Sequence, residues 1–150
     1  MADVKKGIIL KGIGGLYFVE TADAVFECKA RGIFRKSGQK PLVGDEVDIL
    51  IGEDGANNTI EKIYPRRSEL MRPPVANLDR LFILSSVRDP NPSTLIIDKM
   101  TAIACWKNIE PVIVITKDDL GDTSELRGIY EKAGIPFFSV SSRDGRGADE

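Results

Sequence analysis

The groups of this chain best suited to chemistry are hydroxyl, ammonium and carboxylate side chains that directly follow short apolar runs. Residues 116–119 follow the apolar run 111–115, and two consecutive serines follow the run 135–140. An aspartate carboxylate accepts two hydrogen bonds side by side, and a lysine ammonium carries its charge on an apolar stem. The candidate ligand-binding residues are Thr116, Lys117, Asp118, Asp119, Ser141 and Ser142.

Alternating strand and helix patterns surround these groups. A capping-box-like pair, Asp122 and Glu125, marks the start of the second expected helix, and Gly134 marks its end. This alternation predicts parallel strands with right-handed crossovers, so the loops after successive strands emerge at one edge of the sheet, where ligands bind. The expected elements are strands at 81–87, 111–115 and 135–140 and helices at 94–108 and 122–133.

The first half of the chain has short β-type runs separated by glycine and polar turns, and it shows no helical periodicity. In the run 24–31, Phe26, Cys28 and Ala30 alternate with charged residues, which is typical of a strand with one face in water. Closely spaced strands of this kind predict an OB-fold barrel, whose face and loops bind nucleic acid, although an SH3-like barrel also fits. The expected strands lie at 7–13, 16–20, 24–31, 43–51 and 58–64.

Basic residues gather in two clusters of the first half, while the formal net charge of the whole chain is -2. The loop 32–41 carries several of them and also an aromatic ring, Phe34. Positive charge pairs with phosphates and an exposed ring stacks on an unpaired base, so we expect this loop to contact RNA. The alternative is that Phe34 closes the end of the barrel and the charges only keep the surface solvated. The candidate RNA-binding residues are Arg31, Phe34, Arg35, Lys36, Lys40, Arg66 and Arg67.

The composition is that of a globular chain, with 150 residues of which 42% are hydrophobic and 29% charged. No apolar run approaches the roughly 20 residues that span a bilayer and no secretory signal pattern occurs, so we expect a cytoplasmic protein with no membrane partner. The chain has two cysteines and no histidine, which excludes a disulfide framework and a Cys/His zinc site. The strand pattern ends near Pro65. We therefore expect an OB-fold RNA-binding domain at 1–66, a linker at 67–77 and an α/β domain at 78–150.

The segment Thr116-Lys117-Asp118-Asp119 resembles the guanine-specificity motif of GTPases, NKxD, with threonine in the asparagine position. The resemblance implies that Asp119 accepts hydrogen bonds from N1 and the exocyclic amine of guanine, a pair of donors that adenine lacks. Lys117 would lay its stem along the base while its ammonium ties neighbouring loops together. Ser142 would present its backbone N–H to guanine O6, in the role of the middle residue of the SAK motif.

Longer segments carry a more specific resemblance. They are Gly14-Gly15 with residues 17–19, RGIFRK at 31–36, PLVGD at 41–45, and LMRPP at 70–74. In this order they resemble the ribosome small-subunit-dependent GTPase A family (RsgA, also called YjeQ or YloQ), over essentially the whole chain. The resemblance implies an OB-fold, a circularly permuted GTPase domain and a zinc-binding domain, and a role in late maturation of the small ribosomal subunit.

The same resemblance implies that the intact protein binds GTP or GDP with Mg²⁺, holds Zn²⁺ in its last domain, and acts as a monomer on the small ribosomal subunit and its rRNA. The sequence contains no Gly-Lys-Ser or Gly-Lys-Thr, and so no G-x-x-x-x-G-K-[ST] phosphate loop. We therefore expect 78–150 to be the N-terminal part of the permuted GTPase domain, cut off before that loop. The chain by itself is expected to contain no catalytic residue and not to hydrolyse GTP.

Two alternatives come from other functional classes. One is a stand-alone OB-fold RNA-binding module whose α/β half is only structural, and the other is an interaction scaffold that binds neither nucleotide nor RNA. A preference for GDP over ADP would argue against the first. Loss of RNA binding when Arg35, Lys36 and Lys40 are neutralised would argue against the second.

Overall fold

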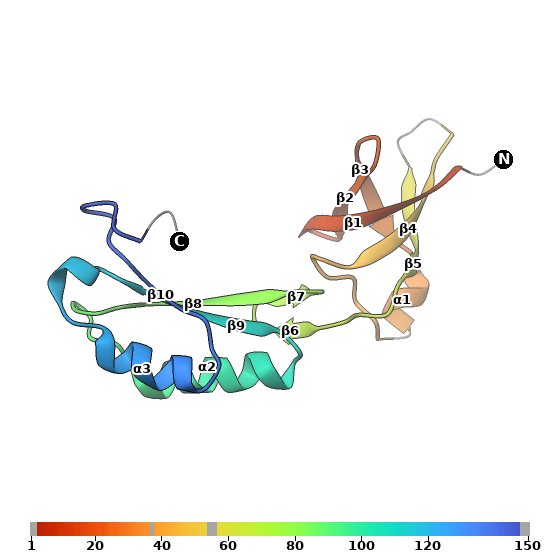
Figure 1. Cartoon of the computed structure of the whole chain (residues 1–150). Coiled ribbons are helices and arrows are strands. Elements are labelled where there is room, and N and C mark those ends of the chain that lie inside the picture. Colours follow the sequence, from red (N-terminus) through yellow and green to blue (C-terminus); the bar gives the residue numbers. More distant parts are fainter. Residues whose placement is uncertain (1–2, 37, 54–56, 148–150) are drawn as a thin grey trace. The chain divides into compact units, whose positions relative to one another are not determined.

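The structure is a computed structural model that describes residues 3–36, 38–53 and 57–147. The side chains of Arg35 and Lys36 lie outside the described residues, so their expected RNA contacts stay predictions. The chain divides into two compact units, Met1–Leu78 and Asp79–Glu150 (Figure 1). Among the described helices, none is long and apolar enough to cross a membrane.

The first unit is built on a closed β-barrel. Its strands follow the order β1-β2-β3-β5-β4, and β4 pairs with β1 to complete the closure. β3 and β5 pair in parallel, while the other neighbours are antiparallel. This arrangement confirms the OB-like barrel that the sequence predicts. The strands are β1 (Asp3–Ile13), β2 (Leu16–Thr21), β3 (Val25–Ala30), β4 (Glu46–Ile51) and β5 (Asn58–Ile63).

The barrel core is filled from every strand because inward and outward residues alternate. On β2, Tyr17 and Val19 are buried, while Glu20 on the same strand is exposed. On β3, Cys28 is buried between the exposed Glu27 and Lys29, as the period-two pattern predicts. The buried core residues are Ile9, Tyr17, Val19, Cys28, Phe34, Val47, Ile49, Ile60 and Ile63.

A short helix, α1 (Gly32–Lys36), begins the loop that was expected to be irregular. Phe34 lies on this helix and is 9% exposed, packed into the barrel core. A helix this short is not visible as sequence periodicity, because periodicity needs several turns. Phe34 thus packs at the end of the barrel core, and its expected RNA contact stays a prediction.

Part of the segment expected as a linker forms a hairpin, β6 (Glu69–Met71) and β7 (Pro74–Ala76). The hairpin packs against the turn before β4, where Ala76 N–H donates to Val43 O at 2.9 Å. Gly44 makes the close approach possible: its φ is +87°, and a Cβ there would lie 2.1 Å from Ala76 O. Residues 69–76 are therefore folded onto the barrel unit.

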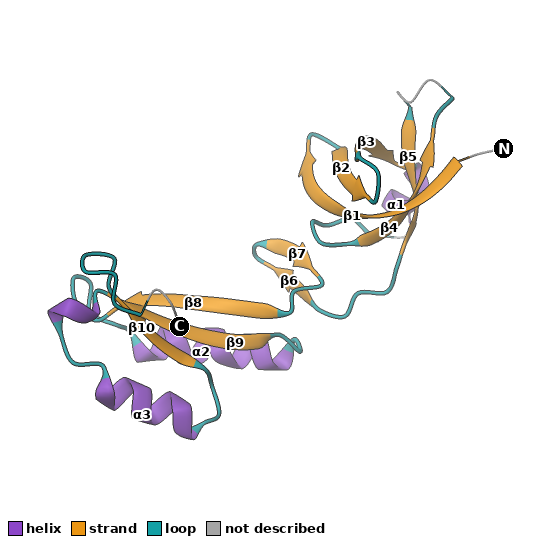
Figure 2. Cartoon of the chain, turned by 45° about the horizontal axis from the view of Figure 1, so that its top comes forward, coloured by secondary structure: helices purple, strands orange, loops and turns teal. Residues whose placement is uncertain are grey.

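The second unit is a parallel sheet with helices on one side (Figure 2). The strand order is β10-β9-β8, and both pairs are parallel, which confirms the expected partial α/β sheet. Its buried core consists of Ile83, Ile97, Ile113, Ile115, Tyr130 and Phe137. The elements are β8 (Arg80–Ser86), α2 (Thr94–Trp106), β9 (Glu110–Thr116), a 3-10 turn η1 (Asp118–Leu120), α3 (Ser124–Lys132) and β10 (Phe137–Val140).

The start of α3 differs from the expected capping box. The N-cap residue is Thr123, and Asp122 instead accepts hydrogen bonds from the Ser124 backbone N–H at 2.9 Å and from its hydroxyl at 2.7 Å. These bonds lower the pKa of Asp122. Thr123 makes no side-chain cap bond because its hydroxyl lies 3.3 Å from Asp118 Oδ1 and from Ser139 Oγ.

Candidate functional site

The carboxyl ends of the three parallel strands meet at one edge of the sheet. In register, Thr116 at the end of β9 lies opposite Ser86 on β8 and Val140 on β10. The Thr116 hydroxyl donates to Ser85 O at 3.1 Å, and Val87 N–H donates to Thr116 O at 3.0 Å. Thr116 therefore fastens the start of its loop to the neighbouring strand.

Lys117 connects this loop to the loop that follows β8. Its backbone is left-handed, with φ 59° and ψ 38°, which turns the chain sharply at the end of the strand. The ammonium donates to Arg88 O at 3.3 Å and also to Asp89 O. The stem of Lys117 thus runs between the two loops, in the position that the sequence predicts for a residue that ties them together.

Asp119 is held by the loop that follows β10. The buried Ser141 hydroxyl donates to Asp119 Oδ1 at 2.8 Å, and Arg143 Nη1 lies 3.8 Å from Oδ2. The Asp119 side chain is 16% exposed. One carboxylate oxygen therefore has a buried hydrogen-bond donor, while the other faces a solvent-exposed cation. Ser142, next in the loop, is exposed, and its backbone N–H has no acceptor among the described residues.

Asp118 has a different role from its neighbour. Its carboxylate accepts a hydrogen bond from Thr123 Oγ1 at 3.3 Å and pairs with Arg146 Nη1 at 3.2 Å. Arg146 O in turn accepts from Ser141 N–H at 2.9 Å, which closes the loop after β10. Asp118 thus joins the two loops through Thr123 and Arg146, and its expected contact with the ligand stays a prediction.

Arginines that the sequence argument did not select complete this edge. Arg127 lies over the Phe137 ring at 5.1 Å, and its Nη2 donates to Ser139 Oγ at 2.8 Å. Arg143 and Arg146 approach the two aspartates described above. Arg143 directly follows the serine pair, so its place in the loop was visible in the sequence, but the partner of each arginine depends on the fold.

The candidate RNA-binding residues on the barrel fall into different environments. Arg31 is exposed and pairs with Glu61. Lys40 is exposed, and no acidic side chain among the described residues pairs with it. Arg67 is exposed, and its backbone N–H donates to Asn77 Oδ1 at 2.8 Å. Arg31, Lys40 and Arg67 stay candidates.

Arg66 differs from these residues in its surroundings. Its side chain is 16% exposed, and it makes a two-pronged contact with the fully buried Asp45 carboxylate at 2.7 and 2.8 Å. Two further donors reach Glu69 Oε2 at 2.9 Å and Lys40 O at 2.7 Å. These partners raise the pKa of the Arg66 guanidinium, chiefly through the Asp45 hydrogen bonds. Four of the five N–H donors of Arg66 are thus used within the barrel unit, and its expected RNA contact stays a prediction.

The described residues contain no group of three or more His, Cys, Asp or Glu side chains that could hold a metal ion.

Solved structures place this arrangement in a class. The crystal structure of YloQ, described as a circularly permuted GTPase, is 31% identical with a TM-score of 0.81 and covers 94% of this chain and 53% of that chain. YjeQ from Thermotoga maritima is also 31% identical, with a TM-score of 0.82 and coverage of 98% and 55%. The fold is thus that of the circularly permuted GTPases.

Family models narrow this class further. The model of the RsgA N-terminal domain matches residues 6–57, and that of the RsgA GTPase matches residues 63–150. The chain belongs to the RsgA family, which confirms the resemblance seen in the sequence.

Two relatives are both named small ribosomal subunit biogenesis GTPase RsgA. The protein from Alkaliphilus metalliredigens is 43% identical over 151 residues, covering 98% of this chain and 52% of its own length. The protein from Ruminiclostridium cellulolyticum is 43% identical over 141 residues, covering 91% and 46%. The chain spans about half the length of these curated relatives.

Proposed function

We propose that this chain is the RNA-contacting and guanine-binding part of a GTPase that acts in small ribosomal subunit biogenesis. The names of its relatives support the biological role. The observation that carries the guanine site is the Asp119 carboxylate, held at the shared edge of a parallel sheet by the buried Ser141 hydroxyl. A carboxylate fixed in this way presents acceptors before a ligand arrives, so little ordering is needed on binding.

In this proposal the guanine base lies between the loops after β9 and β10. Asp119 accepts from the N1–H and the exocyclic amine, and the exposed Ser142 N–H donates to O6. The stem of Lys117 covers one face of the base. The Thr116 hydroxyl donates to Ser85 O, so it can meet the base only as an acceptor. Adenine has no matching pair of donors and would leave a desolvated carboxylate without partners, at a cost of about 1–3 kcal/mol.

In this proposal none of the residues described above hydrolyses GTP. The sequence has no Gly-Lys-Ser or Gly-Lys-Thr, so no phosphate loop cradles the β- and γ-phosphates here. We propose that the chain by itself binds the base without turnover. In the intact protein, nucleotide would switch the affinity of a cytoplasmic, monomeric factor for the small subunit, and the barrel would bind its rRNA.

The test is a titration of the 150-residue chain with GDP and with ADP, followed by NMR chemical shifts. We expect GDP to shift backbone amides of residues 116–119 and 141–143 at lower concentration than ADP does. Both diphosphates carry the same charge, so ADP is the matched control for phosphate binding alone. Equal responses to the two nucleotides would support the alternative of an RNA-binding module with a structural α/β half.

A further inference from the structure

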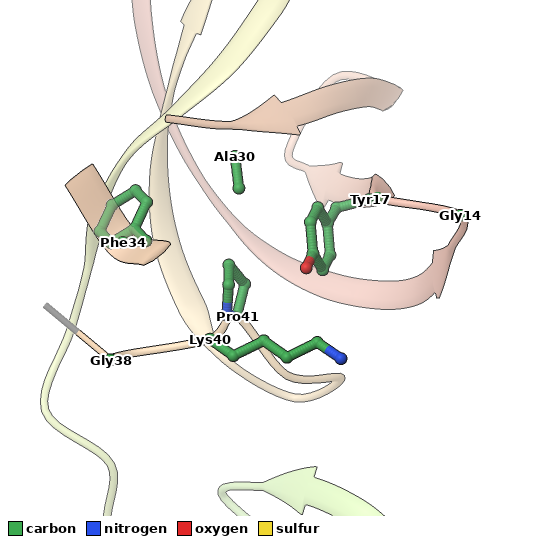
Figure 3. Close-up of a pocket in the computed structure, with 8 residues that line it drawn as sticks. Gly14, Tyr17, Ala30, Phe34, Gly38, Lys40 and Pro41 are labelled. Carbon is green, nitrogen blue, oxygen red and sulfur yellow. The ribbon is translucent and has the colours of Figure 1, made fainter. Parts of the chain in front are cut away.

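A cavity opens on the barrel between the turn that joins β1 to β2 and the segment after α1. Its volume is about 510 Å³, within the range of small-ligand sites. The cavity lies entirely within the first unit, and Figure 3 shows the Tyr17 and Phe34 rings on either side of Pro41. The lining residues are Gly14, Gly15, Tyr17, Ala30, Phe34, Gly38, Lys40 and Pro41.

Tyr17 brings a hydroxyl group to this cavity. The residue is 8% exposed, and its hydroxyl has no hydrogen-bond partner among the described residues. Figure 3 shows the hydroxyl turned into the cavity, on the side of Pro41 and Lys40. The hydroxyl can therefore donate to or accept from a group that enters the cavity. The Tyr17 ring packs against the backbone of Gly12, because a Cβ at that position would lie only 3.2 Å from Tyr17 Cδ1 and Cε1.

The wall opposite the β1–β2 turn is rigid and carries one positive charge. Arg66 Nη2 donates to Lys40 O at 2.7 Å, and the buried Asp45 accepts from Leu42 N–H at 2.7 Å. The Asp45–Arg66 pair therefore holds the backbone of the loop at residues 40–42 through hydrogen bonds. The Lys40 ammonium itself is exposed and has no acidic partner among the described residues.

The β1–β2 turn leaves the mouth of the cavity open. Gly14 and Gly15 both have positive φ, at 59° and 89°, and ideal Cβ atoms built on them would meet nothing within 4 Å. The turn thus offers bare backbone to an incoming group, at the loop through which OB-fold barrels contact nucleic acid.

We propose that this cavity binds one unpaired nucleotide of single-stranded RNA. The base enters between the rings, with its polar edge on the Tyr17 hydroxyl, and the adjoining phosphate pairs with Lys40. A hydroxyl both donates and accepts, so it suits any base edge, and an apolar wall suits the base faces. A base inside a duplex is stacked and paired, so the ligand is a loop or single strand. This inference rests on the RNA-binding role proposed for the barrel.

The experiment measures fluorescence anisotropy of labelled single-stranded RNA pentamers with the 150-residue chain. The probes are adenylate, cytidylate and uridylate pentamers, a pentamer of the same backbone without bases, and a duplex of equal length. Tyr17→Phe removes only the hydroxyl, and we expect it to weaken binding of one or more base-bearing pentamers about two- to tenfold. The base-free pentamer is expected to bind Tyr17→Phe as it binds the unmodified chain.

Lys40→Gln separates the phosphate contact from the base contact. It is expected to weaken all single-stranded probes and to reduce the slope of log affinity against log salt by about one, while Tyr17→Phe leaves that slope unchanged. Lys99→Gln, on exposed α2, removes the same charge away from the cavity and is the matched control. Thermal unfolding of each variant checks that the barrel is intact.

The outcomes are distinct. Equal binding of every pentamer by Tyr17→Phe and the unmodified chain overturns the nucleotide pocket and leaves the RNA role of the barrel standing. Equal affinity for base-free and base-bearing pentamers, or tighter binding of the duplex, also overturns the pocket. Absence of binding to every RNA probe by the unmodified chain overturns the proposed RNA role itself.

Discussion

Replacing Asp119 with asparagine changes one acceptor of the proposed base-binding carboxylate into a donor and leaves the side chain almost the same size. The Ser141 hydroxyl donates to Oδ1 at 2.8 Å, so the amide oxygen is favoured in that position. The amide NH₂ then takes the place of Oδ2, which lies on the side of Arg143. The variant therefore presents one acceptor and one donor where the original residue presents two acceptors.

The size of the effect follows from the hydrogen bonds that are exchanged. Guanine would bring its exocyclic amine against the new NH₂, losing a hydrogen bond to a charged group that contributes about 1.5–3 kcal/mol. That loss corresponds to GDP affinity about ten- to 150-fold weaker. Xanthine carries a carbonyl in place of that amine, so it matches the Asp119→Asn side chain with both hydrogen bonds satisfied. Xanthosine diphosphate should therefore bind the variant more tightly than GDP does.

The assay is an NMR titration of both chains with GDP, xanthosine diphosphate and ADP. Asp118→Asn is the matched control, because that carboxylate is occupied by Thr123 and Arg146 and should leave the preference for GDP in place. If Asp119→Asn binds GDP as well as the original chain does, Asp119 does not read the base. The same conclusion follows if Asp118→Asn produces the larger change in preference.

Two further predictions concern the barrel. Asp45→Ala leaves the guanidinium of Arg66 without its buried partner and should lower the free energy of unfolding by about 3–5 kcal/mol, measured by urea unfolding followed by circular dichroism. The control is Arg80→Ala, which breaks an ion pair whose arginine is 61% exposed and should cost under about 1 kcal/mol. Similar values for the two variants would contradict the structural role of the buried pair. Burial raises the pKa of Cys28 to about 11, so its thiol is almost entirely protonated at pH 8. At that pH a thiol reagent should modify only the exposed Cys105 of the folded chain, and Cys28 should react when the pH rises past its raised pKa or when the chain unfolds. Fast modification of both cysteines at pH 8 would contradict this prediction.

The fold could be predicted from the sequence where burial imposes a period. Alternation on β3 and the continuous apolar run of β9 each mark a strand, because one buried face or two leave that trace in the residue types. The α1 turn left no such trace, since one helical turn is held by a single packed ring, Phe34. The β6–β7 hairpin was hidden because its partner is the turn at Gly44, far away in sequence.

The candidate site was predictable in position and less so in the roles of its residues. Strand order alone brings the loops after β9 and β10, and with them the candidate residues, to one edge of the sheet. Asp118 and Asp119 are identical in type and adjacent in sequence, so only their partners separate them: Arg146 and Thr123 occupy the first, and Ser141 holds the second. Those partners follow from loop geometry that no local pattern encodes.

On the barrel, too, side chains with the same positive charge differ only in their partners. Arg66 and Lys40 were both candidate RNA contacts in the sequence, and the structure gives their side chains different surroundings. Arg66 has its donors on Asp45, Glu69 and Lys40 O, so its charge is neutralised inside the protein. Because that last bond holds the backbone of Lys40, Arg66 helps to set where the Lys40 side chain leaves the loop. Under the proposed contact between Lys40 and phosphate, a change at Arg66 would therefore alter RNA affinity through the backbone of Lys40.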